Sequence, residues 1–233
     1  MKKYLIIVLL ALLLIAGCGS DEPTEDIDYL TTQDGVKIAY NFHQGEDHGV
    51  ILLHQTGGDR HTYRTLYETL ANEGRSVITI DFRGHGESDL DYNAFTEQDW
   101  NSLRLDVKAA RDFLAEQGVY KVAIVGSSIG ANIALKYAVE DGKILSLILI
   151  SPGEEYNGVK TLPYTEHFQR PVLVIAGKED EYASTSATRI YNALEGIKDL
   201  KLYPTEQHGT NLLAFENTYQ DISYWLNEYG NAK

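Results

Sequence analysis

A serine flanked by glycines stands at a change of character in the stretch AIVGSSIGANIAL, residues 123–135. A β-branched apolar run precedes the segment GSSIG, residues 126–130, and an alanine-rich, helix-like run follows it. This is the G-x-S-x-G pattern of a nucleophile elbow, a strained turn from strand to helix in which glycines on both sides of the serine avoid a steric collision. A tight turn with a capping serine would account for one glycine but not for both. The pattern predicts Ser128 as a nucleophile and Ser127 as its neighbour.

A serine nucleophile needs a base that is oriented by an acid. His208 follows the last apolar run and precedes the final helical pattern, whereas His54 and His85 are expected to brace loops behind the elbow. Asp180, at the end of PVLVIAGKED, is the favoured acid, and the chain order Ser128, Asp180, His208 is one that a known serine-enzyme fold uses. The other carboxylates near the same two strand ends are Glu154, Glu155, Glu179 and Glu181.

These residues are positioned by apolar runs that alternate with helical patterns. The stretch YLTTQDGVKIAYNFHQ, residues 29–44, predicts a hairpin around Asp34-Gly35. Several later runs lack polar alternation, which indicates strands buried on both faces of a parallel, doubly wound α/β sheet. The predicted strands are Val50–His54, Ser76–Phe82, Val122–Val125, Leu145–Ile150, Val172–Ala176 and Leu200–Tyr203. The predicted helices are Tyr63–Ala71, Gln98–Glu116, Ala131–Val139, Ser184–Leu194 and Leu212–Glu228.

Motifs in a fixed order resemble the α/β-hydrolase superfamily from about Thr31 to Tyr229. They are LLHQTGGDR (52–60), DFRGHGES (81–88), GSSIG (126–130), GKED (177–180) and EQHGT (206–210). The resemblance implies a mostly parallel α/β-hydrolase fold over a single domain, residues 29–233. Many members carry a lid before the acid strand, but here Ser151 to Arg170 leaves only 20 residues, so we expect no large cap.

The resemblance also implies an oxyanion hole built from backbone N–H groups. One donor would be Ile129, directly after the nucleophile, where the start of a helix favours negative charge. The second would be the N–H of Gln55 or of Thr56, in the loop after His54, where the family commonly has glycine in place of Gln55. No cofactor is implied, and the sequence contains neither a metal-binding histidine spacing nor a phosphate loop.

The chemistry expected of these residues is transfer of an acyl group to water. His208 would take the Ser128 proton, Asp180 would hold the imidazole, and the substrate would be a small acyl compound, most simply a carboxylic ester. A serine peptidase or a lysophospholipase of the same fold is an alternative, and so is a non-catalytic ligand-binding lipoprotein, against which the complete set of nucleophile, base and acid argues. Two further expectations concern the surroundings: Tyr156 and Tyr182 would line a pocket, and the pair Asp81 and Arg83 would form a hydrogen-bonded brace.

The N-terminal segment has the pattern of an exported lipoprotein. Two lysines precede a 13-residue apolar run, Tyr4 to Ala16, which is short for a bilayer span and typical of a secretory signal. The run ends in IAGC, which resembles a bacterial lipobox around the only cysteine, Cys18. We expect residues 1–17 to be a signal peptide, Cys18 to be acylated and residues 18–28 to be an acidic tether. An ordinary signal peptide or a short anchor with an incidental cysteine is the alternative.

The composition limits the partners. A formal net charge of −14 argues against nucleic acid, which requires a basic face, and against electrostatic attachment to anionic lipid. The expected location is the cell envelope outside the cytoplasm, with contact to the membrane through the lipid anchor alone.

Overall fold

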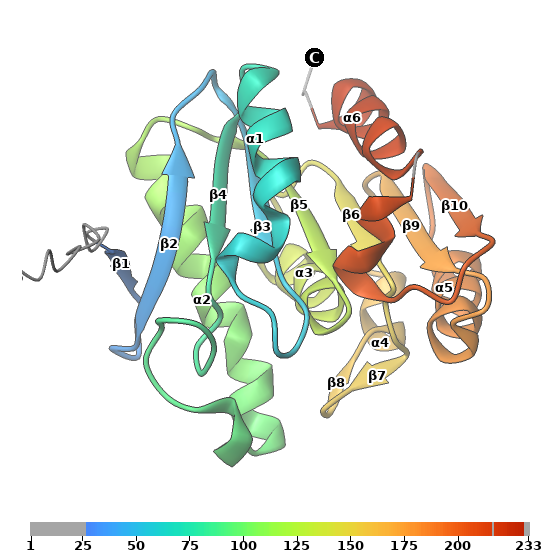
Figure 1. Ribbon diagram of the computed structural model, residues 1–233, viewed down its shortest axis with the longest axis horizontal. Helices are drawn as coiled ribbons and strands as arrows, with labels where there is room; N and C mark the ends of the chain where they lie inside the picture. Colours follow the sequence, from blue (N-terminus) through green and yellow to red (C-terminus); the bar gives the residue numbers. More distant parts are fainter. Residues whose placement is uncertain (1–26, 216, 231–233) are drawn as a thin grey trace, which may run out of the picture.

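An eight-stranded sheet in the order β1-β2-β4-β3-β5-β6-β9-β10 runs through the molecule (Figure 1). The computed structural model describes residues 27–215 and 217–230, so the predicted signal peptide, Cys18 and most of the predicted tether lie outside the described residues. Strands β1 (Asp28–Thr31) and β2 (Lys37–His43) form the antiparallel hairpin predicted around Asp34-Gly35. β2 pairs antiparallel with β4, and the remaining pairings of this eight-stranded sheet are parallel. The predicted fold class is confirmed.

The parallel strands follow the predicted runs closely. Both faces of β3, β4, β5, β6 and β9 are covered, so successive side chains are buried on alternate sides, which explains why polar alternation is missing from their sequences. The edge strand β10 is only partly buried. The strands are β3 (His48–Leu53), β4 (Ser76–Ile80), β5 (Lys121–Ser127), β6 (Leu147–Ile150), β9 (Val172–Gly177) and β10 (Lys198–Tyr203).

Helices cover the two faces of the sheet and enclose two apolar cores. Helices α2 (Glu97–Glu116), α3 (Ile129–Asp141) and α5 (Glu181–Ala193) lie on one face, where Ile51 and Ile124 point. Helices α1 (Arg64–Asn72) and α6 (Thr218–Tyr229) lie on the other, where Leu52 and Val125 point. No helix within the described residues is long and apolar enough to cross a membrane.

The connection between β6 and β9 contains no large cap, as predicted. It forms a two-stranded hairpin, β7 (Glu155–Tyr156) and β8 (Val159–Lys160), followed by the single turn α4 (Leu162–Thr165). Asn157 and Gly158 both have positive φ, 49° and 79°, which is the backbone of a tight type I′ hairpin turn. The 3₁₀ turns η1 (Arg60–Tyr63) and η2 (Tyr92–Ala94) belong to earlier loops.

The prediction of one helix over Leu212–Glu228 is wrong. The chain instead forms the 3₁₀ turn η3 (Gly209–Ala214), becomes extended at Phe215 (φ −77°, ψ 131°) and begins α6 at Thr218. The Phe215 ring stacks on Tyr203 at a centroid distance of 5.0 Å, and the Thr218 hydroxyl donates to the Leu212 carbonyl at 2.7 Å. These tertiary contacts stabilise the break in what the sequence periodicity presents as one helix.

Candidate active site

Ser128 occupies a strained turn between β5 and α3. Its φ is 53° and its ψ is −120°, a conformation that a side-chain-bearing residue rarely adopts and that requires support from its surroundings. The flanking glycines provide the space. A Cβ at Gly126 would lie 2.4 Å from the Gly130 carbonyl oxygen, and a Cβ at Gly130 would lie 2.4 Å from the carbonyl oxygen of Leu53 at the end of β3. Both glycines are therefore needed for the helix to start this close to the sheet.

A continuous line of hydrogen bonds joins Ser128, His208 and Asp180. The His208 Nε2 lies 2.9 Å from the Ser128 Oγ, and its Nδ1 lies 2.5 Å from the Asp180 Oδ2. Since a carboxylate can only accept, Nδ1 carries the proton and Nε2 is the atom that accepts from the serine hydroxyl. The other Asp180 oxygen accepts weakly from the Ala183 N–H at 3.4 Å, which caps α5. One carboxylate thus holds the imidazole and begins a helix.

The other carboxylates considered from the sequence do not contact His208. Glu154 pairs with Arg189 at 2.7 Å, and Glu155 lies 3.8 Å from Lys160 within the small hairpin. The remaining two, Glu179 and Glu181, flank Asp180 with exposed side chains. Within the described residues, no group of three or more His, Cys, Asp or Glu side chains is arranged to hold a metal ion.

The backbone N–H groups of Ile129, Thr56 and Gln55, near Ser128, have no protein acceptor in the described part of the chain. Ile129 is the first residue of α3, so its N–H has no intrahelical partner. The second is the N–H of Thr56. The Gln55 carbonyl accepts from the Gly58 N–H at 3.0 Å and from the His54 Nδ1 at 2.7 Å, so it points into the protein. Because the peptide is trans, the Thr56 N–H points the opposite way. The N–H of Gln55 likewise has no acceptor there, but its orientation is not fixed by these bonds.

The Gln55 side chain has a role that the sequence did not reveal. Its Oε1 accepts from the Ser127 hydroxyl at 2.8 Å, from the Thr210 hydroxyl at 3.0 Å and, weakly, from the Thr210 N–H at 3.4 Å. These donors come from the elbow and from the loop that carries His208. We call this cluster of Gln55, Ser127 and Thr210 the amide junction. The signal available in the sequence was a polar residue at a position where related proteins commonly have glycine.

His54 and His85 lie behind the elbow, as expected. His54 is fully buried, and its Nε2 accepts from the Phe82 N–H at 3.0 Å, so Nδ1 carries the proton. Burial lowers the pKa of His54 from 6.5 to about 3, which keeps the ring neutral. His85 stacks on Tyr92 at 4.3 Å, and burial lowers its pKa also. Both rings therefore pack as neutral groups.

Asp81 and Arg83 both take part in hydrogen-bonded braces, as expected, but they do not bind each other, because their side chains lie against different neighbours. Asp81 binds the Arg60 guanidinium at 2.5 Å and ties the loop after β3 to the loop after β4. Arg83 binds Asp106 of α2 at 2.8 Å and Asp34 of the first hairpin turn at 2.7 Å. Each residue braces the site's loops, but through a separate ion pair.

Tyr156 lies beside the His208 ring and Tyr182 packs against Tyr156, while their expected role in lining a pocket stays a prediction. The Tyr156 ring meets the His208 ring edge-on, with centroids 6.1 Å apart, and contacts the Tyr182 ring at 5.5 Å. The Tyr182 hydroxyl donates to the Glu155 carbonyl at 2.7 Å and accepts from the Glu155 N–H at 3.2 Å. The aromatic pair thus forms a wall of the site.

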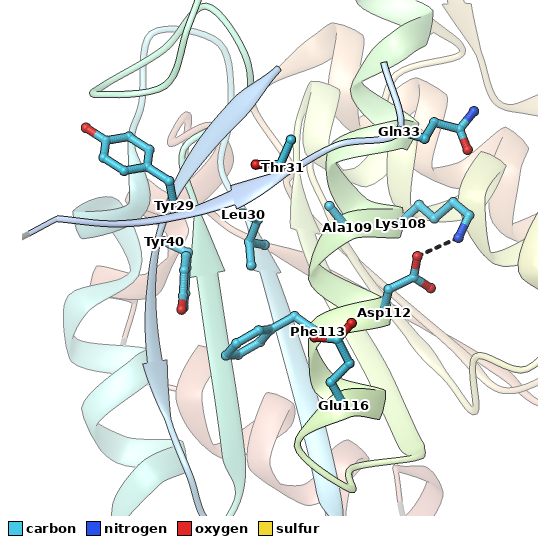
Figure 2. Close-up of a pocket in the computed structure, with 10 residues that line it drawn as sticks. All are labelled: Tyr29, Leu30, Thr31, Gln33, Tyr40, Lys108, Ala109, Asp112, Phe113 and Glu116. Carbon is cyan, nitrogen blue, oxygen red and sulfur yellow. Dashed lines mark hydrogen bonds and ion pairs between the residues drawn. The ribbon is translucent and has the colours of Figure 1, made fainter. Parts of the chain in front are cut away.

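A separate pocket lies far along the sheet, between the first hairpin and α2 (Figure 2). It encloses about 370 Å³ and is lined by aromatic residues such as Tyr40 and Phe113, with the ion pair Lys108–Asp112 at its rim. None of Ser128, His208 and Asp180 lines it. It is distinct from the candidate active site.

Comparison with known proteins identifies the family. The family described as "Serine aminopeptidase, S33" matches residues 45–163, just over half of the chain. The chain belongs to this family. It is an α/β hydrolase, and the matched region contains the elbow, the loop after β3 and the small hairpin.

Individual proteins that resemble the chain share about a third of its residues or fewer in the aligned regions. The probable alcohol acetyltransferase of Cyberlindnera fabianii is 36% identical over 171 residues, which are 68% of this chain and 44% of that protein, so the chain spans less than half of that relative's length. An esterase of Pyrococcus furiosus has a similar structure, with a TM-score of 0.76, 23% identity, and coverage of 88% of this chain and 93% of that one. A dienelactone hydrolase of Anabaena variabilis gives a TM-score of 0.71, 20% identity, and coverage of 88% and 97%. At these sequence identities, the similarity to the two structures shows the fold of this chain alone.

Proposed function

We propose that the protein is a serine hydrolase that cleaves carboxylic esters through an acyl-enzyme intermediate. The observation that carries the proposal is the hydrogen-bonded line Ser128–His208–Asp180 beside the N–H groups of Ile129 and Thr56, which have no acceptor among the described residues. The esterase and the dienelactone hydrolase of similar structure support the ester class.

In the first half of the reaction, the Ser128 Oγ attacks the ester carbonyl carbon while His208 Nε2 accepts its proton. The negative charge that develops on the carbonyl oxygen would be held by the N–H groups of Ile129 and Thr56, and Asp180 stabilises the imidazolium. His208 then gives the proton to the leaving alcohol. In the second half, water loses a proton to His208 and attacks the acyl carbon; the bond to the Ser128 Oγ then breaks, His208 returns the proton to that oxygen, and the acid is released.

Labelling with a fluorophosphonate probe tests the proposal directly. The wild-type protein should be labelled and should hydrolyse short-chain esters, whereas Ser128→Ala should do neither. Protein that folds but is not labelled would favour the non-catalytic ligand-binding alternative. A panel of esters, amino-acid amides and lysophospholipids would then separate the esterase from the peptidase and the lysophospholipase.

We also propose that the enzyme acts in the cell envelope, outside the cytoplasm, held to the membrane by acyl chains on Cys18. The support is the sequence alone: a basic start, a short apolar run and a single cysteine after IAG. Mass spectrometry of the N-terminal peptide from membrane fractions should find an acylated Cys18. An unmodified Cys18, or a mature chain that starts elsewhere, would refute the anchor.

A further inference from the structure

The hydroxyl of Tyr156 lies next to the reacting groups but takes no part in the mechanism above. It donates to the Ser151 carbonyl at 3.3 Å, well beyond the usual length of a hydroxyl hydrogen bond, so this bond is easily exchanged for a better acceptor. Burial and the Asp180 charge raise the pKa of Tyr156 above its ordinary value, while the neighbouring Ser128 hydroxyl acts to lower it. The phenol therefore keeps its proton and is available as a neutral donor beside the serine.

The backbone around Tyr156 is fixed on the side of α3. The Asn132 side chain, fully buried, donates to the Val159 carbonyl at 2.8 Å and accepts from the Gly153 N–H at 3.1 Å. The Thr161 hydroxyl donates to the Gly153 carbonyl at 2.8 Å. On the side of α5, the Tyr182 hydroxyl makes its two bonds to Glu155. A hairpin held at both ends places one side chain reproducibly, which a contact with substrate requires.

The strand order decides which part of a substrate Tyr156 faces. Ser128 follows β5, which lies between β3 and β6. The loop that carries Thr56 follows β3, and Tyr156 comes from the hairpin after β6, so the two approach the serine from opposite sides. The carbonyl oxygen of a bound ester would point toward the β3 side. The leaving oxygen would point toward His208 Nε2, whose ring Tyr156 contacts.

We propose that Tyr156 is a further catalytic residue, whose hydroxyl donates a hydrogen bond to the leaving-group oxygen of the ester. This inference rests on the proposed esterase function. As the carbon–oxygen bond breaks, the bonding electron pair moves to the leaving oxygen, which takes its proton from the imidazolium of His208. Tyr156 keeps its own proton throughout and stabilises the charge before that transfer is complete.

The substitution Tyr156→Phe, assayed with two acetate esters, tests this role. Phenylalanine keeps the ring contact with His208 and removes only the hydroxyl. Ethyl acetate has a poor leaving group that needs help, whereas p-nitrophenolate is stable as an anion. We expect kcat/KM for ethyl acetate to fall about 10- to 100-fold, the worth of one hydrogen bond to a charged group, and kcat/KM for p-nitrophenyl acetate to fall less than about 3-fold. The ratio of the two values is independent of how much of the preparation is folded.

The matched control is Tyr182→Phe, which removes the hydroxyl that clamps the hairpin but leaves that of Tyr156. It should lower both kcat/KM values together and leave their ratio close to that of the wild type. If Tyr156→Phe left the ratio unchanged, or altered only the preference for butyrate over acetate as the acyl group, the leaving-group role would be wrong while the esterase function would stand. A wild-type protein that cleaved neither ester would overturn the proposed function together with this inference.

Discussion

Replacing Gln55 by leucine should weaken the fold and slow ester hydrolysis together, because the amide junction ties the loop after β3 to the elbow and to the loop that carries His208. Leucine has a similar size but no acceptor. The Ser127 hydroxyl is fully buried and Thr210 nearly so, which keeps both donors away from water once the amide is gone. A Cβ at Gly209 would lie 3.2 Å from the Gln55 Oε1, so the histidine loop packs directly against this group.

The size of the effect follows from the hydrogen bonds. Two of the three, at 2.8 and 3.0 Å, are of normal length, and the third, at 3.4 Å, is too long to count fully. A buried donor without a partner costs about 1–3 kcal/mol. Because hydroxyls can rotate to another acceptor, we expect Gln55→Leu to lose about 2–4 kcal/mol of unfolding free energy. A loop displaced by about 1 Å costs roughly 100-fold in rate, so kcat should fall by about that factor with little change in KM.

Urea unfolding followed by circular dichroism, with steady-state hydrolysis of a short-chain ester, measures both effects. Gln44→Leu is the matched control, since Gln44 is exposed and should change the unfolding free energy by less than about 0.5 kcal/mol. In the double variant with Ser127→Ala, one donor is already absent, so the two losses should be non-additive by about 0.5–3 kcal/mol. Additive losses, or a lower stability with unchanged kcat, would refute the idea that this amide positions the loops.

Other expected outcomes follow from the same geometry. Asp180→Asn should lower kcat about 10⁴-fold with little loss of stability, because asparagine still caps α5. Glu154→Gln, assayed beside it, should lower kcat less than about tenfold. Comparable losses of kcat from the two variants would mean that the two carboxylates share the role of the acid. Ser128→Ala should abolish ester hydrolysis while Ser127→Ala keeps more than about a tenth of it, and the reverse result would place the elbow one residue away. The pKa of His54 is about 3 in the folded protein against an ordinary 6.5, so as the pH falls through this window only the unfolded chain gains a proton there and stability is lost. Between about pH 7 and pH 5 this loss of unfolding free energy is about 2 kcal/mol. In urea unfolding, the His54→Gln variant should lack that part of the pH dependence of stability. An unchanged pH dependence would show that the imidazole titrates alike in the folded and unfolded states.

The elbow could be predicted from the sequence because its causes are local. Gly126, Ser128 and Gly130 lie within five residues, and the steric reason for that spacing acts over the same distance. The start of α2 is similarly local: the Thr96 hydroxyl accepts from the Asp99 N–H while Asp99 accepts from the Thr96 N–H, a capping box formed between residues three positions apart. The buried strands could also be predicted, since a continuous run of apolar residues is expected to be covered on both faces of a sheet.

Predictions failed where a distant contact decided the outcome. The helical pattern over residues 212–228 is real, but the stacking of Phe215 on Tyr203 favours a break that no local pattern reveals. Asp81 and Arg83 have opposite charges close together in the sequence, yet Arg60 and Asp106 are the partners that the fold brings to them. In both cases the stabilising contacts come from residues outside the segment.

The sequence by itself determined the strands, the elbow and the chain order of serine, acid and histidine, because hydrophobic periodicity and backbone sterics act between near neighbours. Only the tertiary structure decided that Asp180 rather than Glu154 contacts His208, and that Gln55 is bound by donors 72 and 155 positions away. The strand order makes β3 and β5 neighbours, whereas β10 is the edge strand, and the loop after β10 brings His208 back to Ser128. Hydrogen bonds form over about 3 Å, so which side chains meet there depends on the packed positions of whole strands, which no short stretch of sequence specifies.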